Sequence, residues 1–324
     1  MVVTMVPDAG LLPEVFPTDR LGSSGMAVPM VRARLRRIAN VRNAITVAGM
    51  WLQSIVVLYG TSIAVQRTHW WWLWIGSFVL MLRIHAMFNI LSHEAAHRLL
   101  FSNQRVNDWV GKWMGGAIAM VNMDAYRRAH MGHHRDALGV NEPDLVLYNG
   151  YPITPIRLRR KLRRDITGES GLKLLKALSR SVRNPKSRTS TLQIISMQMV
   201  MAAMLGVTIG WWVWPVIWLG SWMTVFRLVS RLRAIAEHGG MVNSKDDRIT
   251  THHVRQSWWA RFWMVPFNTG WHVAHHVDAG IPFRNLPAFH AELVQSGWLV
   301  PQLEYPNYVT LWRRLGSATP ARIA

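Results

Sequence analysis

Three short histidine motifs stand out in this sequence: HEAAH at 93–97, HMGHH at 130–134 and HVAHH at 272–276. Together they contain eight of the 14 histidines. On a helix, positions i, i+3 and i+4 share one face, so each motif can direct its imidazoles to a common point. A structural role for all eight is disfavoured, because every buried imidazole needs hydrogen-bond partners. The spacing therefore predicts that these motifs bind metal.

A ninth candidate ligand is His238, in the segment RLRAIAEHGG that follows the last apolar block. A helix that continues from this block would bring His238 within about one or two turns of the membrane surface, near the height expected for His93. The alternative is a helix C-terminal histidine that complements the helix dipole ahead of Gly239 and Gly240. We favour the ligand.

The number of histidines bears on the kind of metal site. Imidazole suits zinc, copper, iron and nickel, so the ligand type alone does not identify the ion. A catalytic zinc usually takes three protein ligands, which would leave most of these histidines without a role. HEAAH also matches the HExxH motif of zinc proteases, but that interpretation leaves both HxxHH motifs unused. The full set fits two metal ions, with room for a small molecule.

The elements that position these histidines are predicted from apolar blocks. Residues 44–66 and 189–226 carry no charge, and residues 70–91 are interrupted only by Arg83 and His85. The second block is long enough to cross a ~30 Å hydrocarbon layer twice. The sequence therefore predicts an all-α integral membrane protein with four transmembrane helices in two hairpins. The predicted spans are about 44–66, 70–91, 190–209 and 211–230, with the metal site in a cytoplasmic helical cap.

The net charge of +20 is distributed unevenly along the chain. Basic residues precede the first span, fill the loop 92–190 and end the fourth span, whereas the turns near Arg67 and Gly210 carry little charge. Positive residues favour the cytoplasmic side, so both termini and the loop are predicted to be cytoplasmic. The basic loop would contact anionic headgroups or an acidic partner. No nucleic-acid recognition motif accompanies the charge, so we expect no nucleic-acid partner.

The remaining organisation is predicted from composition. Residues 1–30 are expected to form a flexible leader, 31–316 a single membrane domain, and 317–324 a C-terminal tail. Residues 107–121 are too short to span and would lie in the interface or re-enter it, while 171–182 are typical of a basic amphipathic surface helix. The chain contains no cysteine, which excludes disulfides and thiolate metal sites.

The combination of HEAAH, HMGHH, the EH pair at 237–238 and HVAHH resembles the membrane-bound fatty-acid desaturases, which are histidine-box di-iron enzymes. The resemblance covers about residues 40–300 and extends to NEPD at 141–144 and to NLPAFH at 285–290. It implies two iron ions, molecular oxygen as co-substrate and a lipid acyl substrate. The ligands that it implies are His93, His97, His130, His133, His134, His238, His272, His275 and His276.

Four polar residues are candidates for a second shell that orients these imidazoles: Glu94, Asp144, Glu237 and Asn268. For each of them a capping or surface role is an equal alternative. His69, His85, His252, His253 and His290 are not expected to bind metal. The EHGG segment lacks the proline of the haem-binding HPGG motif, so electrons are expected from an external donor, a ferredoxin or a cytochrome with its reductase.

Two other functions remain open. A hydroxylase or ketolase of lipids or carotenoids would use similar boxes, and only its products would distinguish it. A non-enzymatic membrane metal carrier would predict histidines along a path through the spans, whereas in this chain they collect in one layer. The acyl chain length, the double-bond position, the acyl carrier (lipid, CoA or acyl carrier protein) and the oligomeric state do not follow from the sequence.

Overall fold

The computed structural model describes residues 4–318, and these are almost entirely helical. The two strands in this part of the chain, β1 (His253–Val254) and β2 (Glu304–Tyr305), pair in parallel over two residues each. Four helical stretches are long and apolar enough to cross a membrane: Pro29–Thr68, Leu73–Ala96, Pro185–Thr208 and Val213–His238. The prediction of an all-α membrane fold with four transmembrane helices is therefore confirmed.

Each helical stretch extends beyond its predicted span at one end or at both. Helix α2 covers Asn40–Thr68 and ends where His69 adopts a left-handed conformation. Helix α3, Leu73–Ala96, continues past the end of its apolar run and carries the first histidine box in its last turn. Helix α10 covers Pro185–Thr208. The fourth stretch combines a π-helical segment η3 (Val213–Leu219), α11 (Gly220–Met223) and α12 (Val225–His238).

The chain divides into two compact units. The first unit comprises Met1–Ile38, Arg128–Lys161 and Arg231–Ala324, and the second comprises Ala39–Arg127 and Leu162–Ser230. The chain passes between the units within α6 (Met123–Arg135), α8 (Pro155–Ile166) and α12. Both units contain residues from the segment 31–316, which was predicted to form one domain.

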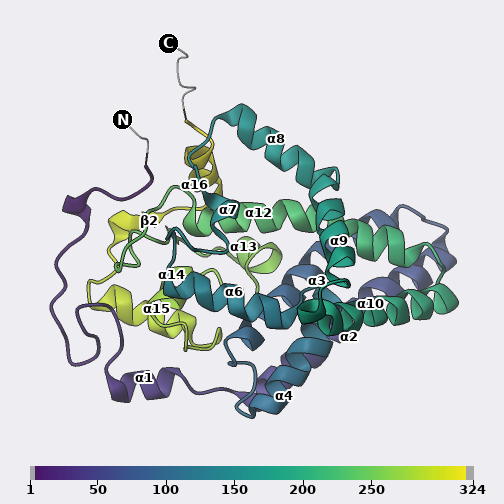
Figure 1. Ribbon diagram of the computed structural model, residues 1–324, viewed down its shortest axis with the longest axis horizontal. Coiled ribbons are helices and arrows are strands. Elements are labelled where there is room, and N and C mark those ends of the chain that lie inside the picture. Colours follow the sequence, from purple (N-terminus) through teal and green to yellow (C-terminus); the bar gives the residue numbers. More distant parts are fainter. Residues whose placement is uncertain (1–3, 319–324) are drawn as a thin grey trace. The chain divides into compact units, whose positions relative to one another are not determined.

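Helix α3 forms the centre of the second unit. It lies beside α2 (Figure 1) and also packs against η2 (Val110–Gly116), η3 and α11. Its side chains Met81, Met87, Phe88 and Ile90 are fully buried, whereas α2 and α10 leave long apolar faces exposed. Exposed apolar faces of this length are what a bilayer would cover.

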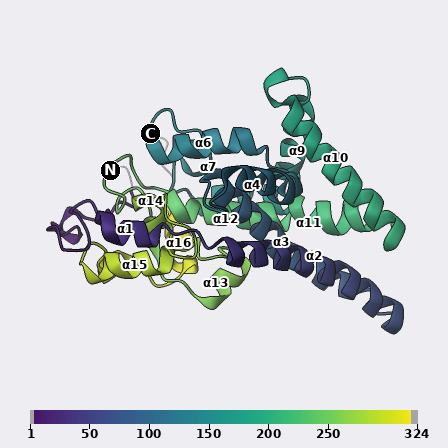
Figure 2. The ribbon, with the colours of Figure 1, turned by 90° about the horizontal axis from the view of Figure 1, so that it is seen from below.

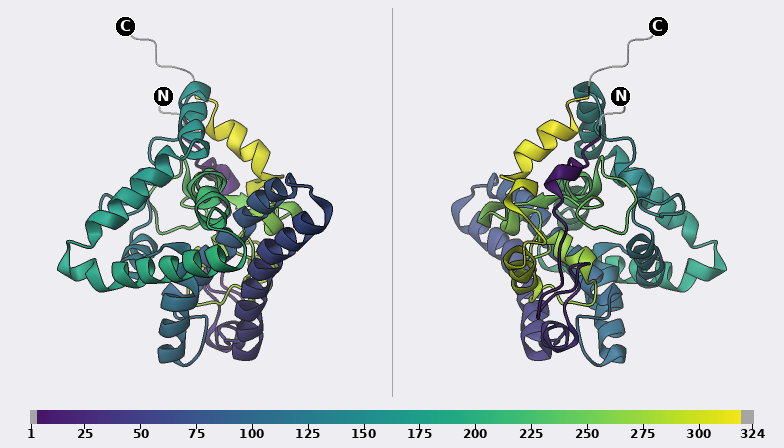
Figure 3. Two further views of the ribbon diagram at one scale, coloured as in Figure 1. Left: turned by 90° about the vertical axis from the view of Figure 1, so that its right-hand side faces the viewer. Right: turned by 90° about the vertical axis from the view of Figure 1, so that its left-hand side faces the viewer.

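The segment 107–121, predicted to lie in or re-enter the interface, forms three short helical pieces in the second unit. These are α4 (Gln104–Trp109), the π-helix η2 (Val110–Gly116) and α5 (Ala117–Ala119). The amphipathic helix predicted at 171–182 is present as α9 (Glu169–Ser181), which packs against α10. Figure 3 shows α9 and α10, in teal and green, as a hairpin.

The core of the first unit joins α1 (Pro29–Leu35), α14 (His272–Val277) and α15 (Leu286–Gln295). Figure 2 shows α1 and α15 side by side. Leu21 and Ala27, from the predicted leader, are buried in the same core. The first unit also contains five further helical elements: η1 (Ala9–Leu11), α7 (Leu145–Tyr148), α13 (Trp258–Trp263), η4 (Pro301–Leu303) and α16 (Tyr308–Leu315). Of the predicted tail, residues 319–324 lie outside the described residues.

An ion-pair cluster ties α1 to the third histidine box. Asp278 follows α14 directly and accepts hydrogen bonds from Arg32 Nε at 2.8 Å and from Arg36. Burial alone would raise the pKa of Asp278, but the hydrogen bonds from Arg36 and Arg32 hold it below its usual value. Asp278 therefore stays ionised and fixes the C-terminal end of the box helix.

Candidate metal centre

The second and third histidine boxes both lie in the first unit, on short helices. His130, His133 and His134 occupy the last turns of α6, and His272, His275 and His276 occupy α14. His238 is the last residue of α12, as predicted from the helical continuation beyond the fourth span. Four of these seven side chains form one group, and the other three form part of a second group.

The first group contains His133, His238, His272 and His276, whose ligand atoms lie within 4.8 Å of one another. Nε2 of His272 lies 3.1 Å from Nε2 of His238 and 3.2 Å from Nε2 of His276. Nε2 of His276 in turn lies 3.2 Å from Nε2 of His133. All four imidazoles therefore present the same nitrogen to one small volume.

Hydrogen bonds on the opposite ring nitrogen fix the tautomers of two of these histidines. His238 Nδ1 lies 2.9 Å from the Thr250 carbonyl oxygen, which can only accept, so Nδ1 carries the proton. His133 Nδ1 donates in the same way to the Glu142 carboxylate, which is buried. With the proton on Nδ1, Nε2 is the ring nitrogen of His133 and of His238 that is left to bind a metal.

This donor set fits a metal ion. One cation shared by the four nitrogens would accept a lone pair from each of them. Two nitrogen ligands at about 2.1 Å from one ion lie ~3.0–3.4 Å apart at angles of about 90–109°. The observed separations of 3.1–3.2 Å match this range.

The other three histidines of the first unit, His130, His134 and His275, also converge. Their ligand atoms lie within 4.8 Å of one another, and Nε2 of His130 lies 3.2 Å from Nε2 of His134. His130 and His275 are buried, and their rings are nearly parallel, 11° apart. A second group of histidines that could hold a metal ion therefore lies beside the four-histidine group.

The first box belongs to the second unit, where the end of α3 is held firmly. His93 and Glu94 are buried, and His97 caps the helix. The free carbonyls of the last turn are satisfied by side chains: Ala95 O accepts from Asn107 Nδ2 at 3.0 Å and from Arg127 Nη2 at 2.8 Å. Arg127 Nε also donates to Ala96 O at 3.0 Å. These caps fix the direction of the turn that carries His93 and His97.

A glycine allows η2 to approach this turn closely. A Cβ atom at Gly111 would lie 2.5 Å from the Ala95 Cβ, a distance that real Cβ atoms do not show. A side chain at position 111 would therefore push η2 away from the first box.

The family model for fatty acid desaturases matches residues 68–312, which include all three histidine boxes and His238. The chain belongs to the fatty acid desaturase family. A search of curated proteins found no significant match. Membership makes this chain a membrane-bound, metal-binding oxidoreductase of the histidine-box type.

The polar residues predicted to orient the box histidines occupy different kinds of position. Glu237 lies 3.6 Å from His272 Nδ1 while also accepting from Arg233 Nε at 2.6 Å. Glu94 is buried beside His93 in the first box. Asn268, in contrast, accepts from Arg261 Nη2 at 3.1 Å on an exposed surface.

In the NEPD motif, Glu142 contacts a box histidine, whereas Asp144 accepts no described hydrogen bond from one. Glu142 accepts from His133 Nδ1 and from the backbone N–H of Leu138. Burial raises the pKa of Asp144, and the charge of the nearby Glu142 carboxylate raises it further. Asp144 was predicted from the sequence and Glu142 was missed, although both stand in the same four-residue motif.

Two further partners were not identified from the sequence. The Tyr148 hydroxyl lies 3.2 Å from His133 Nδ1, and the Thr250 carbonyl orients His238. Every residue has a backbone carbonyl, so the residue type at position 250 could not indicate this contact. The only available signal for Tyr148 was its position in the apolar segment after NEPD.

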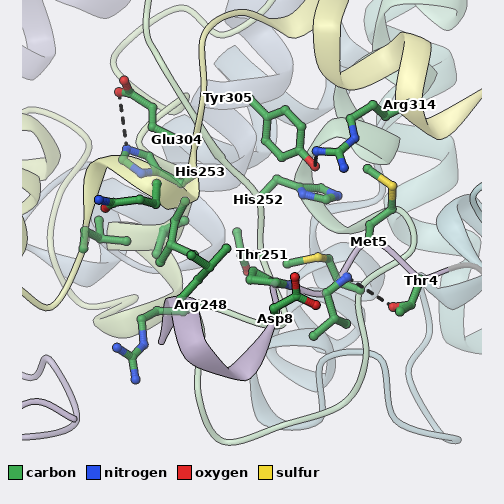
Figure 4. A pocket seen from close by; sticks show the side chains of 18 of the residues that line it. Thr4, Met5, Asp8, Arg248, Thr251, His252, His253, Glu304, Tyr305 and Arg314 are labelled. Atoms are coloured by element: carbon green, nitrogen blue, oxygen red, sulfur yellow. Dashed lines mark hydrogen bonds and ion pairs between the residues drawn. The ribbon is translucent and has the colours of Figure 1, made fainter. Parts of the chain in front are cut away.

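The remaining histidines of the first unit lie outside both groups. His252 Nε2 bonds the Gly239 carbonyl at 2.7 Å, and burial lowers the pKa of His252 to about 4. His253 packs against His290, with ring centroids 5.0 Å apart. His252 and His253 line a separate cavity of about 420 Å³ with Arg314 and Glu304 (Figure 4).

Proposed function

We propose that this protein inserts a double bond into a fatty acyl chain in an oxygen-dependent reaction at a di-iron centre. The observation that supports this proposal most directly is the four-histidine group, whose Nε2 atoms converge within a chain of the desaturase family. When bound, two iron ions would supply the oxygen-activating chemistry that an unactivated methylene pair requires.

The nine candidate histidines divide between the two ions in this proposal. One ion would be held by His133, His238, His272 and His276, the group with shared Nε2 contacts. The other would be held by His130, His134 and His275, with His93 and His97 of the first box completing its ligands. The proposal for the first box depends on its spacing and on the family's motif.

The roles of the protein's own residues follow from their contacts. Glu142 and the Thr250 carbonyl hold protons on Nδ1 of His133 and His238, which keeps Nε2 available to the metal. Asp278, paired with Arg32 and Arg36, holds the end of α14 in place. The acyl substrate would enter from the bilayer, and a separate ferredoxin or cytochrome with its reductase would supply electrons. Basic surface residues would favour an acidic carrier.

The reaction product tests this proposal. We expect that expression in a host lacking unsaturated acyl chains, with a matched electron donor, yields new mono-unsaturated chains. Hydroxylation starts from the same hydrogen abstraction, and the outcome depends on how rigidly the chain is held. Analysis of total acyl chains by gas chromatography and mass spectrometry would distinguish the two. Hydroxylated chains without unsaturated ones would contradict desaturation and identify a hydroxylase.

The charge distribution leads us to propose that both termini and residues 92–190 face the cytoplasm. Because the chain has no cysteine, single cysteines report topology without background. We expect Ser179→Cys to react with a membrane-impermeant maleimide only after the membrane is permeabilised, and Arg67→Cys to react in intact cells. Labelling of Ser179→Cys from outside in intact cells would refute this orientation.

A further inference from the structure

The first unit carries an exposed aromatic surface that the metal centre does not use. This aromatic surface consists of Trp258, Trp259 and Phe262 on α13, a short helix at the edge of the first unit in Figure 2. Trp258 is 72% exposed and Trp259 is 58% exposed. They are the only exposed tryptophans among the described residues of this unit. Tryptophan is a highly buried residue type on average, so two exposed in succession mark a surface that something outside the chain covers.

The polarity of α13 is the reverse of that expected for a helix on a water-facing surface. Successive helical residues turn by about 100°, so Trp258 and Phe262 both point away from the side on which Ala260 lies. Ala260 is buried, and it is the smallest side chain of the helix. The helix therefore packs its smallest side chain against the first unit and exposes its largest ones. Packing within the unit gives no stabilisation to the exposed rings, so they require an apolar or interfacial environment outside it.

The charges on this segment are compatible with lipid headgroups. Arg261 is exposed and lies on the flank of the aromatic surface, about 60° around the helix from Trp258. Its guanidinium donates to Asn268 and lies over the Trp271 ring, 5.2 Å from the ring centroid. Residues 248–277 contain no Asp or Glu, so no carboxylate of this segment would be repelled by anionic headgroups. Arg255, just before the helix, is paired with Glu304 and adds no net charge.

Tryptophan rings are enriched where a membrane meets water, because each ring combines an apolar body with a polar N–H group. Four helices of this chain are long and apolar enough to cross a bilayer, so a lipid surface is always available to the protein. We propose that the aromatic surface of α13 inserts into the interfacial layer of this bilayer, with the helix parallel to the membrane plane. Arg261, on the flank, would extend toward the headgroups. This contact with the membrane is separate from the four spans and ties the first unit to the lipid surface.

Fluorescence quenching in lipid nanodiscs tests this proposal, because the cysteine-free chain accepts a fluorophore at one chosen cysteine. We expect the label on Phe262→Cys to lose more than about half of its emission to a nitroxide near the headgroup end of the lipid chains, since interfacial helices insert only ~5–10 Å. A nitroxide near the methyl end should quench this label less. The order should be reversed for Met199→Cys, which is exposed on the spanning helix α10.

Lys245→Cys is the control for a water-facing position, because Lys245 is exposed in a polar loop of the first unit. Neither nitroxide should quench its label. Quenching at position 262 no greater than at position 245 would overturn the proposal, and the aromatic surface would then be free to bind a partner protein. Stronger quenching at position 262 by the methyl-end nitroxide would also overturn it, because the helix would then lie deeper than the interface.

Two double variants test whether the tryptophans hold this contact. Trp258→Ser/Trp259→Ser should reduce the quenching of the label at position 262 severalfold. Trp70→Ser/Trp71→Ser removes two similarly exposed tryptophans from the second unit and should leave this quenching unchanged. All four side chains are exposed, so neither change should unfold the protein. Equal quenching in the two double variants would refute the role of Trp258 and Trp259. These measurements report position in the membrane, so they remain informative if the proposed reaction is wrong.

Discussion

We expect His133→Ala to abolish both desaturation and metal binding at the four-histidine group. Nε2 of His133 is 3.2 Å from that of His276, and its Nδ1 is held by Glu142 in a tautomer suited to ligation. Removing the imidazole takes away one ligand and leaves Glu142 buried without its histidine partner. Loss of a residue that only orients a ligand costs 10–100-fold, so loss of the ligand should lower activity by more than about 100-fold. Metal content per chain and acyl-product analysis would measure the two losses.

His252→Ala provides the matched control for this experiment. His252 is also a buried histidine of the first unit, bonded to the Gly239 carbonyl one residue after His238, but it belongs to neither metal group. This variant should keep its metal, although it loses some stability. A similar loss of metal in both variants would indicate general unfolding. Wild-type metal content in His133→Ala would contradict the assignment of this residue as a ligand.

The second large effect is expected at Glu142. We expect Glu142→Ala to weaken metal binding by 10–100-fold, because His133 loses the acceptor that keeps the proton on Nδ1. Glu142→Gln retains a carbonyl acceptor without the charge, so its loss should be smaller. Titration of the purified apoprotein with Fe²⁺ against a competing chelator would measure the affinities.

Asp144→Asn is the control, because Asp144 stands two residues away in the same motif. Its carboxylate accepts no described hydrogen bond from a box histidine, so we expect less than a threefold change in metal affinity. A greater loss from Asp144→Asn than from Glu142→Ala would show that the sequence-based choice of Asp144 was correct and that Glu142 does not orient His133.

The fold class and the kind of site could be predicted from the residues alone. Charge-free runs such as 44–66 predict membrane helices directly, because a bilayer core admits few charges and demands internal backbone hydrogen bonding. The two HxxHH boxes predict convergent imidazoles because i, i+3 and i+4 share a helix face, and both boxes are helical. The position of His238 at the end of a helix was also predicted from a local rule, the continuation of a helix beyond its apolar run.

The groups that orient these histidines could not be predicted in the same way, because they come from separate segments of the chain. The choice between Glu142 and Asp144 depends on how the chain folds back after α6, where Glu142 also accepts from Leu138 N–H. The Thr250 carbonyl reaches His238 from 12 residues away, and Asn107 and Arg127 reach the α3 carbonyls from 12 and 32 residues away. Residue type and periodicity describe neighbours along one helix. Contacts between separate segments depend on the path of the chain in space, which no local pattern encodes.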